Sequence, residues 1–336
     1  MVFITGATGL LGSHLILDLL LKGEEVRALK RKTSNTEQVR LLFEHYHPNK
    51  GDKLFSKIEW IEGDLLDVTS LSDGMKDCSA VYHCAAMVSF VKRDFKKMMK
   101  INKHGTANVV NCCLAEKIDE LIYVSSTAAI GRDPLKEFYT EANKWVNSVD
   151  NSNYAVTKYS AELEVWRGTE EGLNAVIVNP CVILGPGNWN ESSLSIFKVV
   201  KKGLKFYTPG MNAFVGVRDV SQAMIRLAEN KVYNDRFLVI SENLFFKDLF
   251  EKIAKAFGVK APSMLVKPWM AGLAWRLEGI LRFLFRKKQN ITKETARSSM
   301  KITKYSSEKL KDKIGFEFRP IDEVISNATA FFEKHN

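Results

Sequence analysis

The sequence has few cysteines and none of the paired spacings that build disulfide or zinc sites. Its five cysteines are an odd number, and no Cys-x-x-Cys occurs. In a chain of 336 residues, this pattern predicts reduced thiols and a cytoplasmic setting. His45 and His47 lack Cys or carboxylate partners at ligand spacing, so we expect no metal site.

Long apolar runs are also missing. No run of 18 apolar residues occurs, so we expect no transmembrane segment. The N-terminal "MVFITGATG" leads directly into a strand and a turn and lacks the parts of a secretory signal, so secretion is not indicated. A hydrophobic content of 46% and a charged content of 26% are ordinary for a soluble globular protein.

Acidic residues are outnumbered by basic ones. The formal net charge is +10 and the pI about 9.2, values that suit a nucleic-acid or anionic-lipid partner. The Lys and Arg residues are scattered along the chain, however, with Asp and Glu among them. We therefore expect a solvated basic surface and no nucleic-acid site.

Short apolar strands alternate with helical spacing in the first half of the chain. Strands are expected at 2–5, 25–30, 58–64, 79–86, 120–126 and 174–180, and residues 12–22 have helical apolar spacing. Such alternation predicts an α/β fold with a doubly wound parallel sheet of the Rossmann type.

The alternation changes after Pro180. Residues 181–193 resemble a loop, a helical piece follows at 194–202, and strand-then-helix spacing returns at 214–241. We expect a dinucleotide-binding domain at 1–180, with 214–241 returning to it. A smaller, mostly helical substrate-binding lobe would comprise 181–213 and 242–336.

Three glycines follow the first strand. Gly6, Gly9 and Gly12 in "TGATGLLG" open the first helix, although the first two are one residue further apart than in G-x-G-x-x-G. Glycine permits a tight turn and lets helix N-terminal N–H groups meet a pyrophosphate. The alternative is a glycine-rich turn that binds nothing.

The ends of the second and third strands predict the type of nicotinamide cofactor. Arg31 and Lys32 stand where a carboxylate would otherwise bind a ribose hydroxyl, so they favour the 2′-phosphate of NADP(H) over NAD(H). A solvated basic loop is the alternative. Asp64, after the third strand, is a candidate adenine contact or the N-cap of the next helix.

A group able to move a proton follows the fifth strand. Tyr154 and Lys158 are one helical turn apart, and Ser126 comes at the end of the strand. We expect Lys158, together with the positive ring of a bound nicotinamide, to lower the pKa of the Tyr154 phenol. Ser126 would hold a substrate oxygen. Asn102 would relay protons toward Lys158 through water.

These motifs together resemble the extended short-chain dehydrogenase/reductases, the NAD-dependent epimerase/dehydratase family. The resemblance covers nearly the whole chain. Its motifs are "TGATGLLG", "GDL" at 63–65, "HCAA" at 83–86, "IN..GTANVV", "VSST", "Y...K...E" at 154–162, "NP.VILGPG" and "YSSEKLKDKIGF".

The resemblance implies a role for individual positions. Ser126, Tyr154 and Lys158 would be catalytic, with Asn102 in support. The implied cofactor contacts are Gly6, Thr8, Gly9, Leu10, Leu11, Gly12, Arg31, Lys32, Asp64, Leu65, Ala85, Ala86, Tyr154, Lys158, Pro180 and Val182.

The branch within the family is inferred from positions at which this sequence differs from the family's dehydratases and epimerases. Thr127 and Ala128 stand where family dehydratases carry an Asp-Glu pair, and Ile130 stands where epimerases tend to have Tyr. The strand "VRALKRK" looks most like the dihydroflavonol-reductase branch. We expect an NADP(H)-dependent carbonyl reductase; a nucleotide-sugar epimerase using NAD and a non-catalytic NAD(P)-binding sensor or scaffold are the alternatives.

Two segments are informative about the substrate. The amphipathic segment 264–288 could line an apolar pocket, contact anionic lipid, or simply face the core. The apolar loop 87–95 also favours a hydrophobic substrate.

A homodimer would pair the helix near 95–116 with the one carrying Tyr154. Its apolar contacts would be Met98, Met99, Ile101, Leu163, Val165 and Trp166, with Glu162 and Glu164 offsetting the charge of Lys96, Lys97, Lys100 and Lys103.

Overall fold

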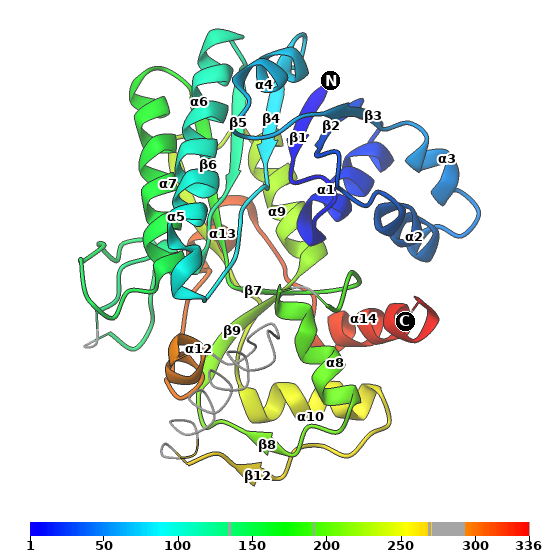
Figure 1. The fold of residues 1–336 in the computed structure, drawn as a ribbon, viewed down its shortest axis with the longest axis vertical. Helices are drawn as coiled ribbons and strands as arrows, with labels where there is room; N and C mark the ends of the chain where they lie inside the picture. The colour runs from blue at the N-terminus through cyan, green and yellow to red at the C-terminus, as the bar shows by residue number, and fades with distance from the viewer. Residues whose placement is uncertain (134–135, 191, 268–269, 271–292, 336) are drawn as a thin grey trace.

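The computed structural model describes residues 1–336 except 134–135, 191, 268–269, 271–292 and 336 (Figure 1). Most of segment 264–288 thus lies outside the described residues, so its three alternative roles, in a substrate pocket, at lipid or facing the core, stay predictions.

A seven-stranded sheet forms the larger part of the molecule (Figure 1). Its strand order is β10-β6-β5-β4-β1-β2-β3, and every neighbouring pair is parallel. The strands are β1 (Val2–Thr5), β2 (Val26–Lys30), β3 (Glu59–Glu62), β4 (Ala80–His83), β5 (Glu120–Val124), β6 (Asn174–Pro180) and β10 (Asp235–Val239). This confirms the predicted doubly wound Rossmann-type fold.

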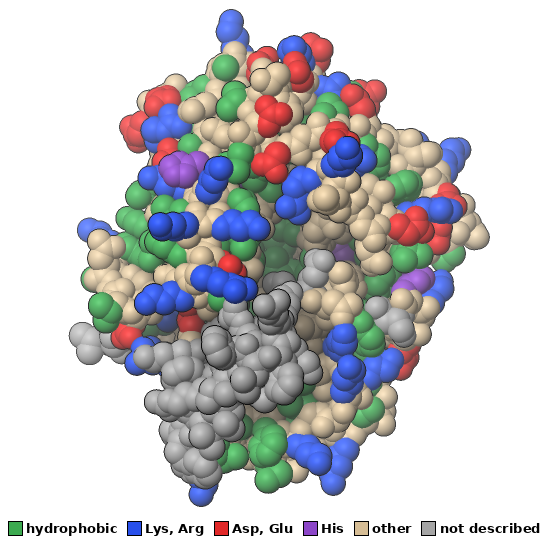
Figure 2. Space-filling view, in the orientation of Figure 1, with side chains coloured by type: hydrophobic (Ala, Val, Ile, Leu, Met, Phe, Trp, Pro, Cys, Tyr) green, Lys and Arg blue, Asp and Glu red, His purple; other side chains and the backbone are tan. Residues whose placement is uncertain are grey.

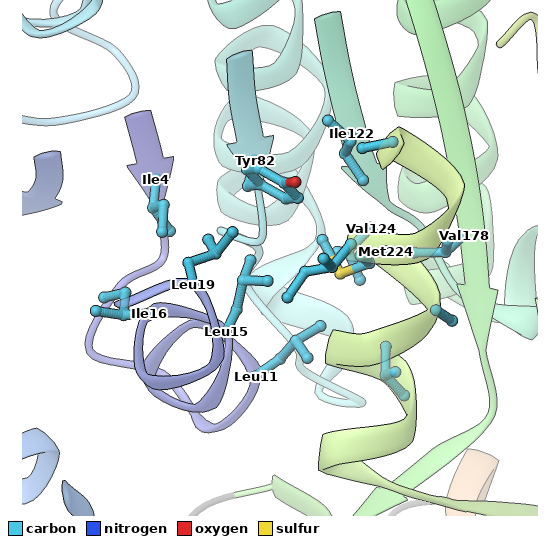
Figure 3. Close-up of a cluster of buried hydrophobic side chains, with 14 of the residues drawn as sticks. Ile4, Leu11, Leu15, Ile16, Leu19, Tyr82, Ile122, Val124, Val178 and Met224 are labelled. Carbon is cyan, nitrogen blue, oxygen red and sulfur yellow. The ribbon is translucent and has the colours of Figure 1, made fainter. Parts of the chain in front are cut away.

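Helices cover both faces because side chains alternate along each strand. Val2 and Ile4 pack with α1 (Leu10–Leu21) and α9 (Val217–Glu229), as Figure 3 shows for Ile4 and α1. Phe3 enters the opposite core. That core is formed with α4 (Val68–Met75), α6 (Gly105–Ala115) and α7 (Asn153–Glu170). The helices α2 (Glu37–Tyr46) and α3 (Gly51–Phe55) lie beyond α1.

The helix expected near 95–116 is built from three consecutive pieces. It runs through α5 (Phe95–Met98), a π-helical segment η2 (Met99–His104) and α6, and the short 3₁₀ turn η1 (Lys92–Asp94) precedes it. Another 3₁₀ turn, η3 (Thr127–Ala129), follows β5.

Smaller sheets and further helices make up the rest. The order β11-β9-β7 joins β7 (Val182–Leu184), β9 (Met211–Gly216) and β11 (Glu242–Phe245), and β8 (Phe206–Tyr207) pairs with β12 (Met264–Leu265). The helical elements are η4 (Ser192–Leu194), α8 (Ser195–Lys201), α10 (Phe246–Ala256), α12 (Lys293–Ser298), α13 (Glu308–Ile314) and α14 (Ile321–His335). Within 214–241, β10 is a strand of the main sheet and α9 packs against that sheet. In contrast, β9 pairs with β7 and β11 in a separate sheet. The division into cofactor domain and substrate lobe stays a proposal.

The carboxyl ends of the main strands face the smaller sheets. In Figure 1 these ends point toward the region of β7 and β9. The space-filling view is hollowed at this level, with hydrophobic side chains on its floor (Figure 2). Ligands of open parallel sheets bind in such a crevice, so the residues that follow β1, β4, β5 and β6 form the candidate site.

Candidate active site

The glycine-rich turn joins β1 to α1 under tight steric limits. Gly6 has φ +71°, and a Cβ added there would lie 2.6 Å from the backbone nitrogen of Ala85. A Cβ on Gly12 would lie 2.2 Å from the Gly6 carbonyl oxygen. Glycine is therefore required at both positions for the backbone to close the turn.

The N-terminus of α1 is suited to an anion. Gly9 is its N-cap, so no side chain caps the helix, and the first turn carries no acidic residue. Thr8 and Leu10 are half-buried, whereas Leu11 packs its side chain in the core (Figure 3). The backbone N–H groups of this turn are the groups that a pyrophosphate would meet.

The predicted cofactor-selecting residues lie at neighbouring strand ends. Arg31 and Lys32 are exposed directly after β2, beside β3, which precedes Asp64. The Asp64 carboxylate accepts the Leu66 N–H at 3.0 Å. The N-cap of α4 is Asp67, so the capping alternative for Asp64 is wrong.

The other predicted cofactor contacts come from three strand ends. Leu65 is buried against Gly105. Ala85 and Ala86 follow β4, and the Ala85 N–H points to the Thr5 hydroxyl at 3.4 Å. Pro180 ends β6 and Val182 begins β7. These residues thus lie at or after the carboxyl ends of β3, β4 and β6, and their contact with a cofactor stays a prediction.

Lys158 is buried beneath this crevice, with 1% of its surface exposed. Its Nζ donates to the Tyr123 hydroxyl at 2.7 Å and to the Val124 carbonyl at 2.8 Å. Burial lowers the pKa of Lys158 to about 7, and the carboxylate of Glu162 opposes this shift. Lys158 therefore changes charge near neutral pH.

Tyr154 and Ser126 come together as the sequence predicts. Tyr154 is half-buried on α7, and a side-chain hydrogen bond with Ser126 favours its ionised form. Burial has the larger effect and raises the pKa of Tyr154 to about 12. In this structure the desolvation of the phenol outweighs any lowering by Lys158, whose ammonium is bound to Tyr123 and Val124. The lowering expected from Lys158 together with a nicotinamide ring stays a prediction.

A buried acidic network lies one turn further along α7. Glu162 is 1% exposed, accepts a hydrogen bond from the Asn179 side chain, and meets Arg236 at 3.3 Å. The expected role of Glu162 in offsetting lysines at a dimer surface is therefore wrong. Glu164 pairs with Lys103 of its own chain at 3.7 Å, so it offsets the charge of one of those lysines.

Asn102 lies in the π-helical segment, and its amide is already engaged. Its Oδ1 accepts the Met87 N–H at 2.7 Å, and its Nδ2 donates to the Met87 carbonyl at 2.9 Å and the Thr157 hydroxyl at 3.0 Å. The side chain thus fixes the loop after β4 to α7. π-Helical turns are frequent at functional sites, but the proton relay stays a prediction.

The same loop brings an aromatic ring to the candidate acid. Phe90 lies edge-on to Tyr154, with centroids 6.1 Å apart, and 41% of it is exposed. Val88 is also exposed, at 44%. The wall beside Tyr154 is therefore apolar, which agrees with the apolar composition of this loop.

A separate groove of about 870 Å³ lies on the outer side of α7. Its lining includes Trp145, Tyr159, Leu163 and Trp166, and the Trp145 and Tyr159 rings stack 4.4 Å apart. Ser126, Tyr154 and Lys158 are not part of that lining. We assign the chemistry to the crevice, because the polar groups able to move a proton converge there.

Two kinds of feature are absent from the described residues. No helix there is long and apolar enough to cross a membrane. No group of three or more His, Cys, Asp or Glu side chains there could hold a metal ion.

Comparison with known proteins gives the family. The model of the NAD dependent epimerase/dehydratase family matches residues 2–239. The chain is 26% identical to a "Putative dihydroflavonol 4-reductase" of Synechocystis sp., covering 99% of this chain and 94% of the relative. It is 28% identical to cinnamoyl-CoA reductase 1 of Petunia hybrida, covering 96% and 89%. The crystal structure of gox2253 has a TM-score of 0.82 at 28% identity, covering 100% and 98%.

The chain belongs to the NAD-dependent epimerase/dehydratase family. This confirms the resemblance to extended short-chain dehydrogenase/reductases, and the named relatives agree with the dihydroflavonol-reductase branch. The protein is thus an NAD(P)-dependent enzyme of that type.

Some residues of the site are not predicted from the sequence. Tyr123, Asn179 and Arg236 surround Lys158 and Glu162 from strands far apart in sequence, so no local spacing identifies them. The sequence gives a weak indication that Glu162 belongs to the site, because it follows Lys158 at the same helical spacing that separates Lys158 from Tyr154.

Proposed function

We propose that this protein is an NADP(H)-dependent oxidoreductase that reduces a carbonyl group of a small hydrophobic substrate. The observation that carries the proposal is the convergence of Ser126, Tyr154 and Lys158 beside the apolar Phe90. Family membership and the reductase names of two relatives support an oxidoreductase.

The chain has residues suited to hold the cofactor. The uncapped α1 N-terminus would bind its pyrophosphate, and Asp64 its adenine. Arg31 and Lys32 are exposed cations with no ion-pair partner among the described residues, so they are available for a 2′-phosphate. When bound, NADPH supplies the hydride.

Tyr154 would be the acid. Its pKa of about 12 keeps the phenol protonated at neutral pH, so it has a proton to give to the carbonyl oxygen as that oxygen gains charge. Ser126 would donate a hydrogen bond to the same oxygen. Protonated Lys158, held by Tyr123 and Val124, would be the buried cation that offsets the negative charge left on the phenolate once the proton has moved.

Two alternative functions are compatible with the same fold. A nucleotide-sugar epimerase would retain NAD and need a polar wall, whereas the apolar ring of Phe90 lies beside Tyr154. A non-catalytic sensor or scaffold has no need for the Ser126, Tyr154 and Lys158 group. Both are therefore less well supported than a reductase.

A substrate panel tests the proposal. Purified protein would be mixed with NADPH or NADH and a series of aldehydes, ketones and nucleotide sugars, and cofactor oxidation followed by absorbance. We expect turnover with apolar carbonyls and a preference for NADPH. Co-purified NAD together with interconversion of sugar epimers would favour the epimerase, and no turnover with any member would favour the sensor.

The cellular compartment and the oligomeric state are also proposals. All five cysteines are free thiols, which supports the proposed cytoplasmic setting. For the proposed homodimer, Leu163 is 49% exposed on α7, but Met98 and Val165 are buried and not available for contact. The apolar surface available for pairing is therefore small.

A further inference from the structure

A basic stripe runs along the helical segment that follows the substrate loop. We define it by Lys92, Arg93, Lys96, Lys97 and Lys100. From 92 to 104 every exposed residue belongs to this stripe, apart from His104. The spacing of three to four residues keeps these side chains on one face. In Figure 2, Lys and Arg side chains gather over the region that Figure 1 labels α5, beside the hollow.

The charges of the stripe are not neutralised within the described part of the chain. No carboxylate there lies within 4.0 Å of the Lys92, Lys96, Lys97 or Lys100 nitrogens. Arg93 approaches only Asp94, at 3.9 Å, and that carboxylate also accepts from Ser89 at 2.6 Å. By contrast, the neighbouring Lys103 is paired with Glu164. The stripe is thus a concentrated positive field available to an outside partner.

Apolar side chains are exposed next to these charges. Val88 and Phe90 precede the stripe by a few residues and are 44% and 41% exposed. Their loop is held to α7 through the Asn102 contacts with Met87 and Thr157. A fixed surface that combines cations with protruding apolar groups has the chemistry of a bilayer-binding face.

We propose that the basic stripe, with Val88 and Phe90, docks the enzyme on an anionic lipid bilayer. The lysines would meet lipid phosphates while the two apolar side chains enter the boundary of the acyl chains. A bilayer accounts for Val88 better than a nucleic acid does, because an aliphatic side chain cannot stack on bases as an aromatic one can. Docking this way sets the lipid surface beside Tyr154, since Phe90 contacts both.

Vesicle sedimentation tests the docking without any substrate, so the result does not depend on which carbonyl is reduced. The full chain would be mixed with phosphatidylcholine vesicles that contain or lack phosphatidylglycerol. We expect binding only to the anionic vesicles at about 0.1 M salt, and release at about 1 M salt, where the Debye length falls to about 3 Å. Failure to bind anionic vesicles at the lower salt concentration would overturn the proposal.

A pair of matched variants then locates the surface. One changes Lys92, Lys96, Lys97 and Lys100 to Gln. The control changes four exposed lysines on and near α3 and α13, Lys50, Lys53, Lys57 and Lys313, to Gln, with the same loss of net charge. Each lysine at an anionic surface is worth about fivefold in binding, so we expect the stripe variant to lose at least about a hundredfold.

The control variant should bind nearly as the wild type does, because its charges lie away from the stripe. Equal losses in both variants would mean that net charge alone drives binding, which would overturn the proposal. Tighter binding to single-stranded DNA than to anionic vesicles, lost in the same stripe variant, would assign the surface to nucleic acid instead.

Discussion

The Nζ of Lys158 lies 2.7 Å from the Tyr123 hydroxyl and 4.5 Å from the centre of the same ring. This relationship holds the ammonium at the carboxyl end of β5, with the buried Glu162 carboxylate as its acidic neighbour on α7. The charge of Lys158 is therefore set by two opposing effects, burial and Glu162.

We predict that catalysis depends on the charge of Lys158. Its pKa is lowered to about 7, so the protonated form predominates below that pH and is lost as pH rises through it. The kcat/KM for carbonyl reduction should therefore fall above about pH 7. In Glu162→Gln the carboxylate that raises the pKa of Lys158 is gone, so the fall should begin at lower pH.

The control for that prediction is Glu164→Gln, two residues further along α7, which removes the ion pairs with Lys103 and Arg167. Its pH profile should match that of the wild type. A Glu162→Gln profile with an unchanged midpoint would show that Lys158 is not the titrating group.

The turn at Gly6 should be intolerant of substitution. Gly6→Ala combines a left-handed backbone, φ +71°, with a Cβ 2.6 Å from the Ala85 nitrogen. We expect it to lower the free energy of unfolding by about 2–4 kcal/mol. Gly258→Ala is the matched control, because Gly258 has φ +65° and nothing within 4 Å; it should cost only about 1 kcal/mol. Equal losses in urea unfolding would contradict the steric account.

Arg31 should decide between the two nicotinamide cofactors. Arg31→Ala removes a charged donor from the proposed 2′-phosphate site, so NADPH affinity should fall about tenfold to a hundredfold, with NADH affinity nearly unchanged. Lys57→Ala, an exposed charge next to α3, should alter neither. Calorimetric titration measures both affinities. Equal weakening of NADPH and NADH would show that Arg31 does not contact the phosphate.

The self-association proposal depends on the outer face of α7. Tyr159, Leu163 and Trp166 share this face and line its groove. We expect sedimentation to give about twice the 38.1 kDa of one chain, and Leu163→Asp to give one chain. A wild-type mass near one chain at micromolar concentration would refute the dimer.

The sequence predicts the site best where each function depends on local spacing. Gly6, Gly9 and Gly12 follow a strand and open a helix, and Tyr154 and Lys158 are one helical turn apart; the structure has both features. The buried strands 2–5 and 174–180 are predicted with their observed bounds, because continuous apolar runs end at the turns.

What depends on tertiary contact could not be predicted. The sequence identifies Lys158 but not Tyr123 as its partner, since that bond joins a strand to a helix 35 residues away. For the same reason the rise of the Tyr154 pKa caused by burial was not predicted: the degree of burial of a phenol is not visible in its neighbours along the chain.

The most direct test of the proposed reductase follows the hydrogen that NADPH supplies. The wild type and Tyr154→Phe would each be given deuterium-labelled NADPH and an apolar carbonyl from the panel, and the alcohol product analysed by mass spectrometry and NMR. We predict deuterium on the carbinol carbon, with kcat lower by about 10²–10⁴-fold in Tyr154→Phe and NADPH affinity nearly unchanged. Product without the label, or undiminished turnover in the variant, would contradict the assignment.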